Sequence, residues 1–201
     1  MGVSRTTVRA ALQSLADDGI ISRRRRHGTV VNRHVLRSSM PLNRLVSFRA
    51  LIEQCGHEPS VDPQIHRAQP ADEDAAAALD IAPGTPCLVV KRLLRAGGEP
   101  VIHICDTVAL DRLPPLGEIV DADSTFGFLA ANGVGTVDYA RAEVVPRVAD
   151  ARAPSELDVA PGTAYIELRE TLFTREHARI AFSRIAVDDT LVRFSLVRRD
   201  L

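Results

Sequence analysis

The chain has 201 residues, of which 45% are hydrophobic and 25% charged, the balance of a globular protein with one large domain or a small and a medium one. No apolar run approaches the roughly 18 residues of a membrane span, and polar residues at 4–7 stand where a signal peptide would be apolar, so a cytoplasmic protein is expected. Residues 1–40 hold eight arginines and two aspartates, a net charge of +6, whereas the rest of the chain holds 17 basic and 24 acidic residues, which indicates a basic element joined to an acidic body.

The first predicted element is a helix from Ser4 to Asp18, with Ser4 as N-cap and Gly19 as the stop. Its apolar residues recur at the spacing of one helical face: Val8, Ala11, Leu12 and Leu15. Two short strands are predicted next, joined by a turn at 26–28: Ile20–Arg25 and Thr29–Asn32. A helix followed directly by a basic hairpin is typical of the second half of a winged helix-turn-helix domain.

Residues 34–45 are polar and irregular, and we expect them to be a linker between a first element at 1–33 and a larger domain at 46–201. The larger domain is expected to begin with a helix over Leu45–Cys55, closed by Gly56. A strand over Val61–Arg67 and a short helix over Asp72–Leu79 follow.

An internal repeat organises the larger domain. The segment Ala78–Thr85 (ALDIAPGT) is echoed by Glu156–Thr163 (ELDVAPGT) at an offset of 78 residues. Each copy leads into two β-rich runs, Cys87–Arg95 and Val101–Leu110 in the first and Ala164–Thr174 and Arg179–Asp188 in the second. A helix at Thr125–Asn132 and strands at Val137–Val148 and Leu191–Arg199 complete the pattern. It predicts an α+β fold with an antiparallel sheet built from two halves related by a rough twofold.

The three cysteines, Cys55, Cys87 and Cys105, are widely separated and odd in number. This spacing predicts neither a disulfide framework nor a zinc site. We interpret them as small buried hydrophobic residues, with a redox switch left open. No metal and no cofactor is expected.

Residues 2–12 (GVSRTTVRAAL), Leu15, 18–21 and 27–31 resemble the recognition helix and wing of the GntR family of bacterial regulators. The remainder resembles the UTRA effector domain of the HutC-type branch, which shares its fold with chorismate lyase. The residues that carry this second resemblance are Ser47, Phe48, Gly56, Leu79, 83–85, Arg92, 98–100, Ser124, Phe128, Leu129, Leu157, Pro161, Gly162 and 182–184. The resemblance implies a partial winged helix-turn-helix followed by a chorismate-lyase-like antiparallel sheet with helices.

The resemblance also implies a function: a ligand-responsive transcriptional regulator, a repressor that a small effector releases from double-stranded operator DNA, acting as a homodimer and not as an enzyme. Two alternatives stay open, a chorismate-lyase-type enzyme and a ligand-binding remnant deficient in DNA binding. The basic helix and hairpin speak against the enzyme, which has no need of them. Family members carry further helices before the position of Gly2, so we expect the winged domain to be N-terminally truncated here.

DNA binding needs cations and hydrogen-bond donors on one face of the recognition helix. Arg5 and Arg9 lie four residues apart and therefore point the same way, and an arginine can fork onto guanine. Family members usually have glycine where this wing has Arg26. The residues expected to contact DNA are Ser4, Arg5, Thr7, Arg9, Arg24, Arg26, His27 and Gly28.

The resemblance places Ser47, Arg92 and Ser124 in the effector cleft, where an arginine offers a planar fork to an anion and hydroxyls complete the site. His103 and Arg184 are further candidates. The alternatives are helix caps for the two serines and a surface strand cation for Arg92. Sugar-phosphate-sensing relatives carry an arginine and two acids at positions occupied here by Leu94, Ile104 and Ala181. We therefore expect a less polar, anionic effector.

Overall fold

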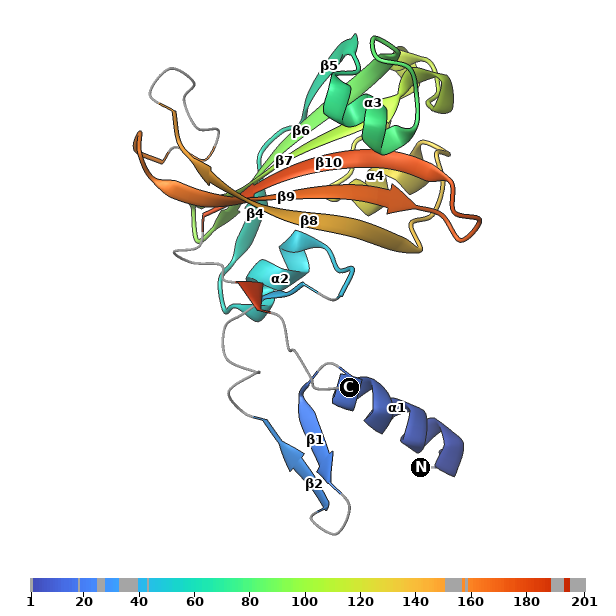
Figure 1. Ribbon diagram of the computed structural model, residues 1–201, viewed down its shortest axis with the longest axis vertical. Coiled ribbons are helices and arrows are strands. Elements are labelled where there is room, and N and C mark those ends of the chain that lie inside the picture. The colour runs from blue at the N-terminus through green and yellow to red at the C-terminus, as the bar shows by residue number, and fades with distance from the viewer. Residues whose placement is uncertain are drawn as a thin grey trace.

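The centre of the molecule is a seven-stranded antiparallel sheet in the order β4-β6-β7-β10-β9-β8, with β5 also paired to β6 (Figure 1). The strands are β4 (Pro59–Val61), β5 (Ile65–Pro70), β6 (Pro86–Ala96), β7 (Glu99–Ala109), β8 (Tyr139–Val148), β9 (Ala164–Phe173) and β10 (Arg179–Val187). This arrangement comes from a computed structural model, which describes residues 2–17, 19–24, 28–32, 40–42, 44–150, 157, 159–188 and 194–195.

The predicted two-half organisation of the sheet is confirmed by the strand order. β6 and β7 form one hairpin, β9 and β10 form the other, and β7 pairs with β10 at the centre. The outer neighbours are β5 in the first half and β8 in the second, so both halves contribute three strands in the same order from edge to centre. The β6–β7 turn falls on Gly97 and Gly98, which have φ of 61° and 94°. Only glycine adopts such values at little cost.

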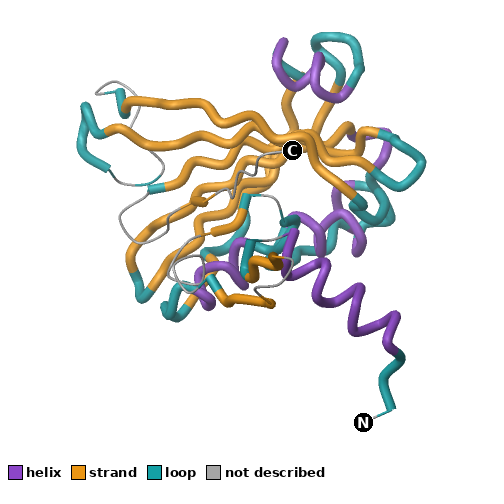
Figure 2. The backbone as a smooth tube through the Cα atoms, turned by 60° about the horizontal axis from the view of Figure 1, so that its bottom comes forward, coloured by secondary structure: helices purple, strands orange, loops and turns teal. Residues whose placement is uncertain are grey.

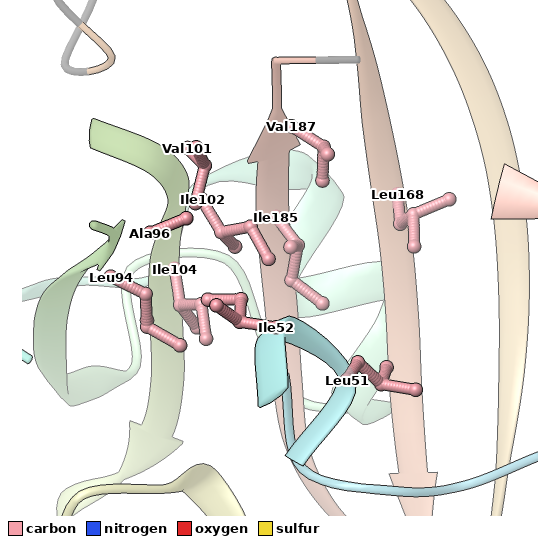
Figure 3. Close-up of a cluster of buried hydrophobic side chains, with 10 residues drawn as sticks. All are labelled: Leu51, Ile52, Leu94, Ala96, Val101, Ile102, Ile104, Leu168, Ile185 and Val187. Carbon is pink, nitrogen blue, oxygen red and sulfur yellow. The ribbon is translucent and has the colours of Figure 1, made fainter. Parts of the chain in front are cut away.

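Two helices cover one face of the sheet, which we call the inner face. Helix α2 (Phe48–Gln54) packs Leu51 and Ile52 against apolar side chains from β6, β7, β9 and β10 (Figure 3). Helix α4 (Thr125–Ala131) packs Phe128 and Leu129 on a second apolar cluster further along the same strands. Each cluster removes branched aliphatic side chains from water, which is the main favourable term in folding.

Helix α3 (Glu73–Leu79) covers the opposite, outer face and packs on Phe182, Cys87 and Ala109. Its N-cap is Asp72, whose carboxylate accepts a hydrogen bond from the amide of Ala75 at 2.8 Å. The short 3₁₀ helices η1 (Leu110–Arg112) and η2 (Leu116–Glu118) lead from β7 toward α4.

Three predicted elements differ from the structure. The strand expected at 61–67 is split into β4 and β5, because Pro63 between them has no amide to continue a ladder. The helix expected from Leu45 begins at Phe48, because the Ser47 hydroxyl caps it. Of the strand expected at 191–199, only β11 (Phe194–Ser195) lies within the described residues, and it pairs in parallel with β3 (Met40–Pro41).

The N-terminal elements lie away from the sheet (Figure 1), and the helix among them projects from the body of the molecule (Figure 2). They are α1 (Arg5–Asp17), β1 (Ile21–Arg24) and β2 (Gly28–Val31), in the predicted order. The side-chain amide of Asn32 donates to the carbonyl of Gly19 at 2.7 Å and to the Ser22 hydroxyl at 2.8 Å, which ties the hairpin to the end of the helix. In the part of the chain that the structure describes, every helix is too short or too polar to cross a membrane.

Candidate functional site

A row of four polar side chains crosses the inner face of the sheet. Asp106 of β7, Ser183 of β10 and Glu170 of β9 are directly opposite one another in the register, and Arg92 of β6 lies diagonally beside Asp106, opposite Ile104. On one side of this polar row is the apolar cluster under α2, and on the other is the cluster under α4. Buried polar groups are costly unless they are paired, so their partners decide what this row can do.

Arg92 and Asp106 form a fully buried ion pair. Arg92 is 1% exposed and Asp106 0%, and Arg92 Nη1 donates to Asp106 Oδ2 at 2.5 Å. The remaining acceptor positions of Asp106 are used by the hydroxyls of Ser183, at 2.5 Å from Oδ1, and Thr125, at 2.8 Å from Oδ2. The carboxylate of Asp106 therefore accepts hydrogen bonds from two strands, β6 and β10, and from helix α4.

The guanidinium of Arg92 is also engaged on its other sides. Its Nε donates to the carbonyl of Ala122 at 3.2 Å, and its Nη2 lies 3.5 Å from Gln64 Oε1. The group sits over the ring of Phe128, 5.3 Å from its centroid, at a distance suited to a cation–π interaction. Arg92 thus fastens β6 to β7 and to the segment before α4.

Glu170 is the one member of the polar row with no hydrogen bond to the described residues. Burial of its carboxyl group, together with repulsion from the nearby Asp106 carboxylate, raises the pKa of Glu170 to about 7. Near neutral pH this side chain is therefore divided between its acid form and its carboxylate form.

A cleft lies above the polar row, between α2 and α4. Its walls come from both helices and from the sheet: Ser47, Phe48, Arg49, Leu94, Ile104, Asp123, Ser124, Thr125, Phe126, Glu170, Leu172, Ser183 and Ile185. The free volume is about 20 Å³, roughly what one water molecule needs. A second space of about 30 Å³ adjoins it and shares Phe48, Phe126 and Glu170. The enclosed part of this cleft is therefore small.

The first residues of the two helices give the cleft its polar rim. The Ser47 hydroxyl oxygen accepts from the amide of Ala50 at 3.3 Å, and that of Ser124 accepts from the amide of Gly127 at 3.1 Å. A hydroxyl that accepts in this way keeps its proton available for a ligand. Arg49 Nη1 and Asp123 Oδ2 approach to 3.4 Å from opposite sides, with side chains 44% and 71% exposed. An ion pair this exposed costs little to break.

The structure brings together some of the predicted effector residues and separates others. Ser47 and Ser124 line the cleft and also cap their helices, so the helix-cap interpretation is confirmed, whereas their role in effector binding stays a prediction. Arg92 lies beneath the cleft and supplies none of its lining, because Asp106 and Ala122 hold its guanidinium.

His103 and Arg184 do not belong to this cleft. Successive side chains of a strand point to opposite faces, and both residues lie out of phase with the polar row, so they sit on the outer face. His103 is 8% exposed. Arg184 Nη2 donates to both carboxylate oxygens of Asp72, at 2.9 and 2.8 Å, at the start of α3. His103 and Arg184 therefore do not share a cleft with Ser47, and a role for them in effector binding stays a prediction.

The sequence interpretation missed Glu170, Asp106, Ser183 and Arg49. The internal repeat contained a signal for Glu170, because the offset of 78 residues equates it with Arg92. The position that carries a cation in the first half thus carries an acid in the second half. Nothing comparable pointed to Asp106, whose importance comes from its three partners.

The N-terminal helix exposes polar side chains near its start, beside the exposed apolar side chain of Val8. Ser4 caps α1 by accepting from the amide of Thr7 at 3.1 Å, and the two hydroxyl oxygens lie 2.9 Å apart. Arg5, Thr7 and Arg9 are exposed, and the two arginines lie one helical turn apart. Gly28 opens β2 with φ of 78°, which accounts for glycine in the wing. The side chain of Arg24 and all of Arg26 and His27 lie outside the described residues.

Comparison with protein families gives two matches in this chain. The model of the UTRA domain matches residues 42–94 and 54–188, a span that contains the sheet, α2 to α4 and the cleft. The model of the bacterial regulatory proteins of the gntR family matches residues 1–31, which contain α1 and both strands of the hairpin.

Individual relatives are similar over most of their length. The uncharacterized HTH-type transcriptional regulator RB1450 of Rhizobium meliloti is 29% identical over 91% of this chain and 75% of its own. The uncharacterized HTH-type transcriptional regulator YurK of Bacillus subtilis is 26% identical over 96% of this chain and 80% of its own. Among solved structures, PhnF from Mycobacterium smegmatis superposes with a TM-score of 0.69 at 25% identity, over 98% of this chain and 86% of PhnF.

Proposed function

The chain belongs to the GntR family of bacterial regulatory proteins and contains a UTRA domain, and we propose that it is a repressor. As a member of this family it is a ligand-responsive DNA-binding regulator of transcription. In our proposal, a small effector releases it from its operator. We propose that residues 1–33 bind DNA and that residues 46–201 bind the effector. The relatives are transcriptional regulators, and we propose that this chain likewise has no catalytic role and acts in the cytoplasm, where its DNA lies.

The observation that carries the effector site is the cleft between α2 and α4. It combines two hydroxyls with free protons, Ser47 and Ser124, with the cation Arg49, above a floor that is otherwise largely apolar. Hydroxyls and a guanidinium together are suited to a carboxylate or a phosphate. We propose that the anionic group of the effector binds here and replaces Asp123 as the ion-pair partner of Arg49.

The same geometry suggests how binding reaches the DNA. The free volume of the cleft is about 20 Å³, and we infer that an effector larger than water displaces α2 from α4. Helix α2 is the first helix after the DNA-binding element, and β3 lies between the two along the chain. A shift of α2 would therefore move the segment from which that element projects. If the protein is a homodimer, as we propose, this changes the spacing of its two reading helices and shifts the population away from the operator-binding state.

Substitution of Arg49 tests this site. Arg49→Ala should weaken binding of small anions roughly tenfold or more, because a charge-assisted hydrogen bond contributes about 1.5–3 kcal/mol. The measurement is titration calorimetry with a panel of short carboxylates and phosphate monoesters, on the wild type and the variant. Arg141→Ala is the matched control, an arginine 72% exposed on the outer face. Equal loss in both variants, or no loss in Arg49→Ala, would place the anion elsewhere.

A further inference from the structure

We propose that the effector is zwitterionic: Glu170 in the floor of the cleft binds an ammonium group, while the rim at Arg49 binds the anionic group of the same molecule. This inference rests on the proposed effector site. It goes beyond it by assigning a second charge to the ligand and a partner for that charge.

The first step is the charge balance of the polar row. Asp106 is neutralised by Arg92, and both of its oxygens accept hydrogen bonds, from Ser183 on one side and from Arg92 and Thr125 on the other. Ser183, which lies opposite Glu170 in the register, gives its proton to Asp106 and not to Glu170. Glu170 is thereby left as the acid of the row that no cation compensates.

The second step is where Glu170 lies. It lines both the cleft and the adjoining space, so a ligand in either would contact it. The side chains beside it in the cleft are largely apolar, including Leu172, Ile185 and Phe126. In such surroundings an ionised carboxylate needs a donor, and an ammonium group supplies both the donors and the opposite charge.

The third step considers every charged group that faces Glu170. Asp106 and Arg92 lie beside it on the sheet and neutralise each other. At the rim, Arg49 on α2 pairs both with Asp123 before α4, at 3.4 Å, and with Glu53 of its own helix, at 3.6 Å, and Arg44 lines the adjoining space. An anion entering at the rim engages Arg49, whereas a cation at the floor meets Glu170 with Asp106 behind it. The two ends of the cleft thus prefer opposite charges.

This arrangement couples binding to proton release. Below pH 7 the free protein holds a proton on Glu170, whose pKa is raised to about 7 by burial and by Asp106. An ammonium group favours the carboxylate, so the proton leaves when the ligand binds. Affinity should therefore rise up to tenfold per pH unit below about pH 7 and level off above it.

The test is titration calorimetry with three matched sets of probes: β-alanine and γ-aminobutyrate, which carry both charges; propionate and butyrate, which lack the amine; and propylamine and butylamine, which lack the acid. Each titration is run below pH 7 in bis-Tris and in imidazole, which carry no anionic group to compete for the rim and whose different ionisation enthalpies report the protons released. The protein variants are Glu170→Gln, which keeps the shape of the side chain, and Glu143→Gln, an exposed control on β8.

We expect the amino acids to bind more tightly than the matching carboxylates and to release a proton. Glu170→Gln should weaken the amino acids roughly tenfold to a hundredfold, abolish proton release, and leave the carboxylates unchanged, whereas Glu143→Gln should change nothing. Carboxylates that bind through Arg49 with no gain from the amine would overturn the ammonium site and leave the proposed anion site standing. Binding by none of the probes at millimolar concentration, or binding that ignores both Arg49 and Glu170, would overturn both.

Discussion

Asp106→Ala should lower the free energy of unfolding by about 3–5 kcal/mol, because it leaves the charge of Arg92 buried without a partner. Arg92 is 1% exposed, so bulk water solvates its guanidinium poorly when the carboxylate is lost. Two further hydroxyls, of Ser183 and Thr125, lose their acceptor in the same step. Urea unfolding followed by circular dichroism measures the change, with the midpoint and slope reported separately.

Two further variants identify the cause of this loss. Asp123→Ala removes a carboxylate that is 71% exposed in its pair with Arg49, and should cost at most about 1 kcal/mol. The double variant Arg92→Met with Asp106→Leu removes both buried charges and should be more stable than Asp106→Ala alone, since an apolar pair of similar volume needs no compensation. If Asp106→Ala costs no more than Asp123→Ala, the buried ion pair does not stabilise the fold.

Arg5→Ala and Arg9→Ala should each weaken operator binding by roughly 1–3 kcal/mol, the range for an arginine that forks onto a guanine. Both side chains are exposed on α1, one turn apart, and the capped start of the helix fixes their direction. A contact to phosphate instead would weaken binding to every sequence and reduce the slope of log affinity against log salt by about 0.9. The salt series therefore tells the two roles apart.

Fluorescence anisotropy of labelled duplexes across a salt series measures this prediction. Arg141→Ala is the control, since it removes an exposed arginine from the sheet domain and should leave DNA affinity unchanged. Circular dichroism of each variant shows whether α1 remains helical. Unchanged affinity and unchanged slope in both Arg5→Ala and Arg9→Ala would remove α1 from the DNA interface.

Most of the architecture could be predicted from local patterns. The helix and hairpin at the N-terminus follow from apolar spacing and turn residues, and the two halves of the sheet follow from the repeated APGT segment. The N-terminal helix and hairpin and the two halves of the sheet are determined by residues that are close together in the sequence. The split between β4 and β5 was harder, because a single residue, Pro63, outweighs the β-rich composition around it.

The site was less predictable, because it depends on which residues the register places side by side. The resemblance placed Arg92 in the effector cleft, but its partner Asp106 lies 14 residues away, on the next strand, and no pattern in the sequence pointed to that ion pair. The sequence could have predicted that His103 lies on the outer face, because side chains alternate between the two faces along a strand and His103 is three residues from Asp106. Glu170 is marked in the sequence only by its equivalence to Arg92 in the internal repeat, and its importance depends on neighbours that leave its charge uncompensated.

The most direct test of the whole account is selection of DNA duplexes from a randomised pool by the protein, followed by sequencing of the bound fraction. A homodimeric regulator that reads DNA through α1 should enrich an inverted repeat, with half-sites separated by one helical turn or a multiple of it. The double variant Arg5→Ala with Arg9→Ala should lose that enrichment while keeping the fold of the sheet domain. A bound fraction with no common sequence, or the same sequence enriched by the double variant, would contradict the assignment of this chain's α1 as the reading helix of a DNA-binding regulator.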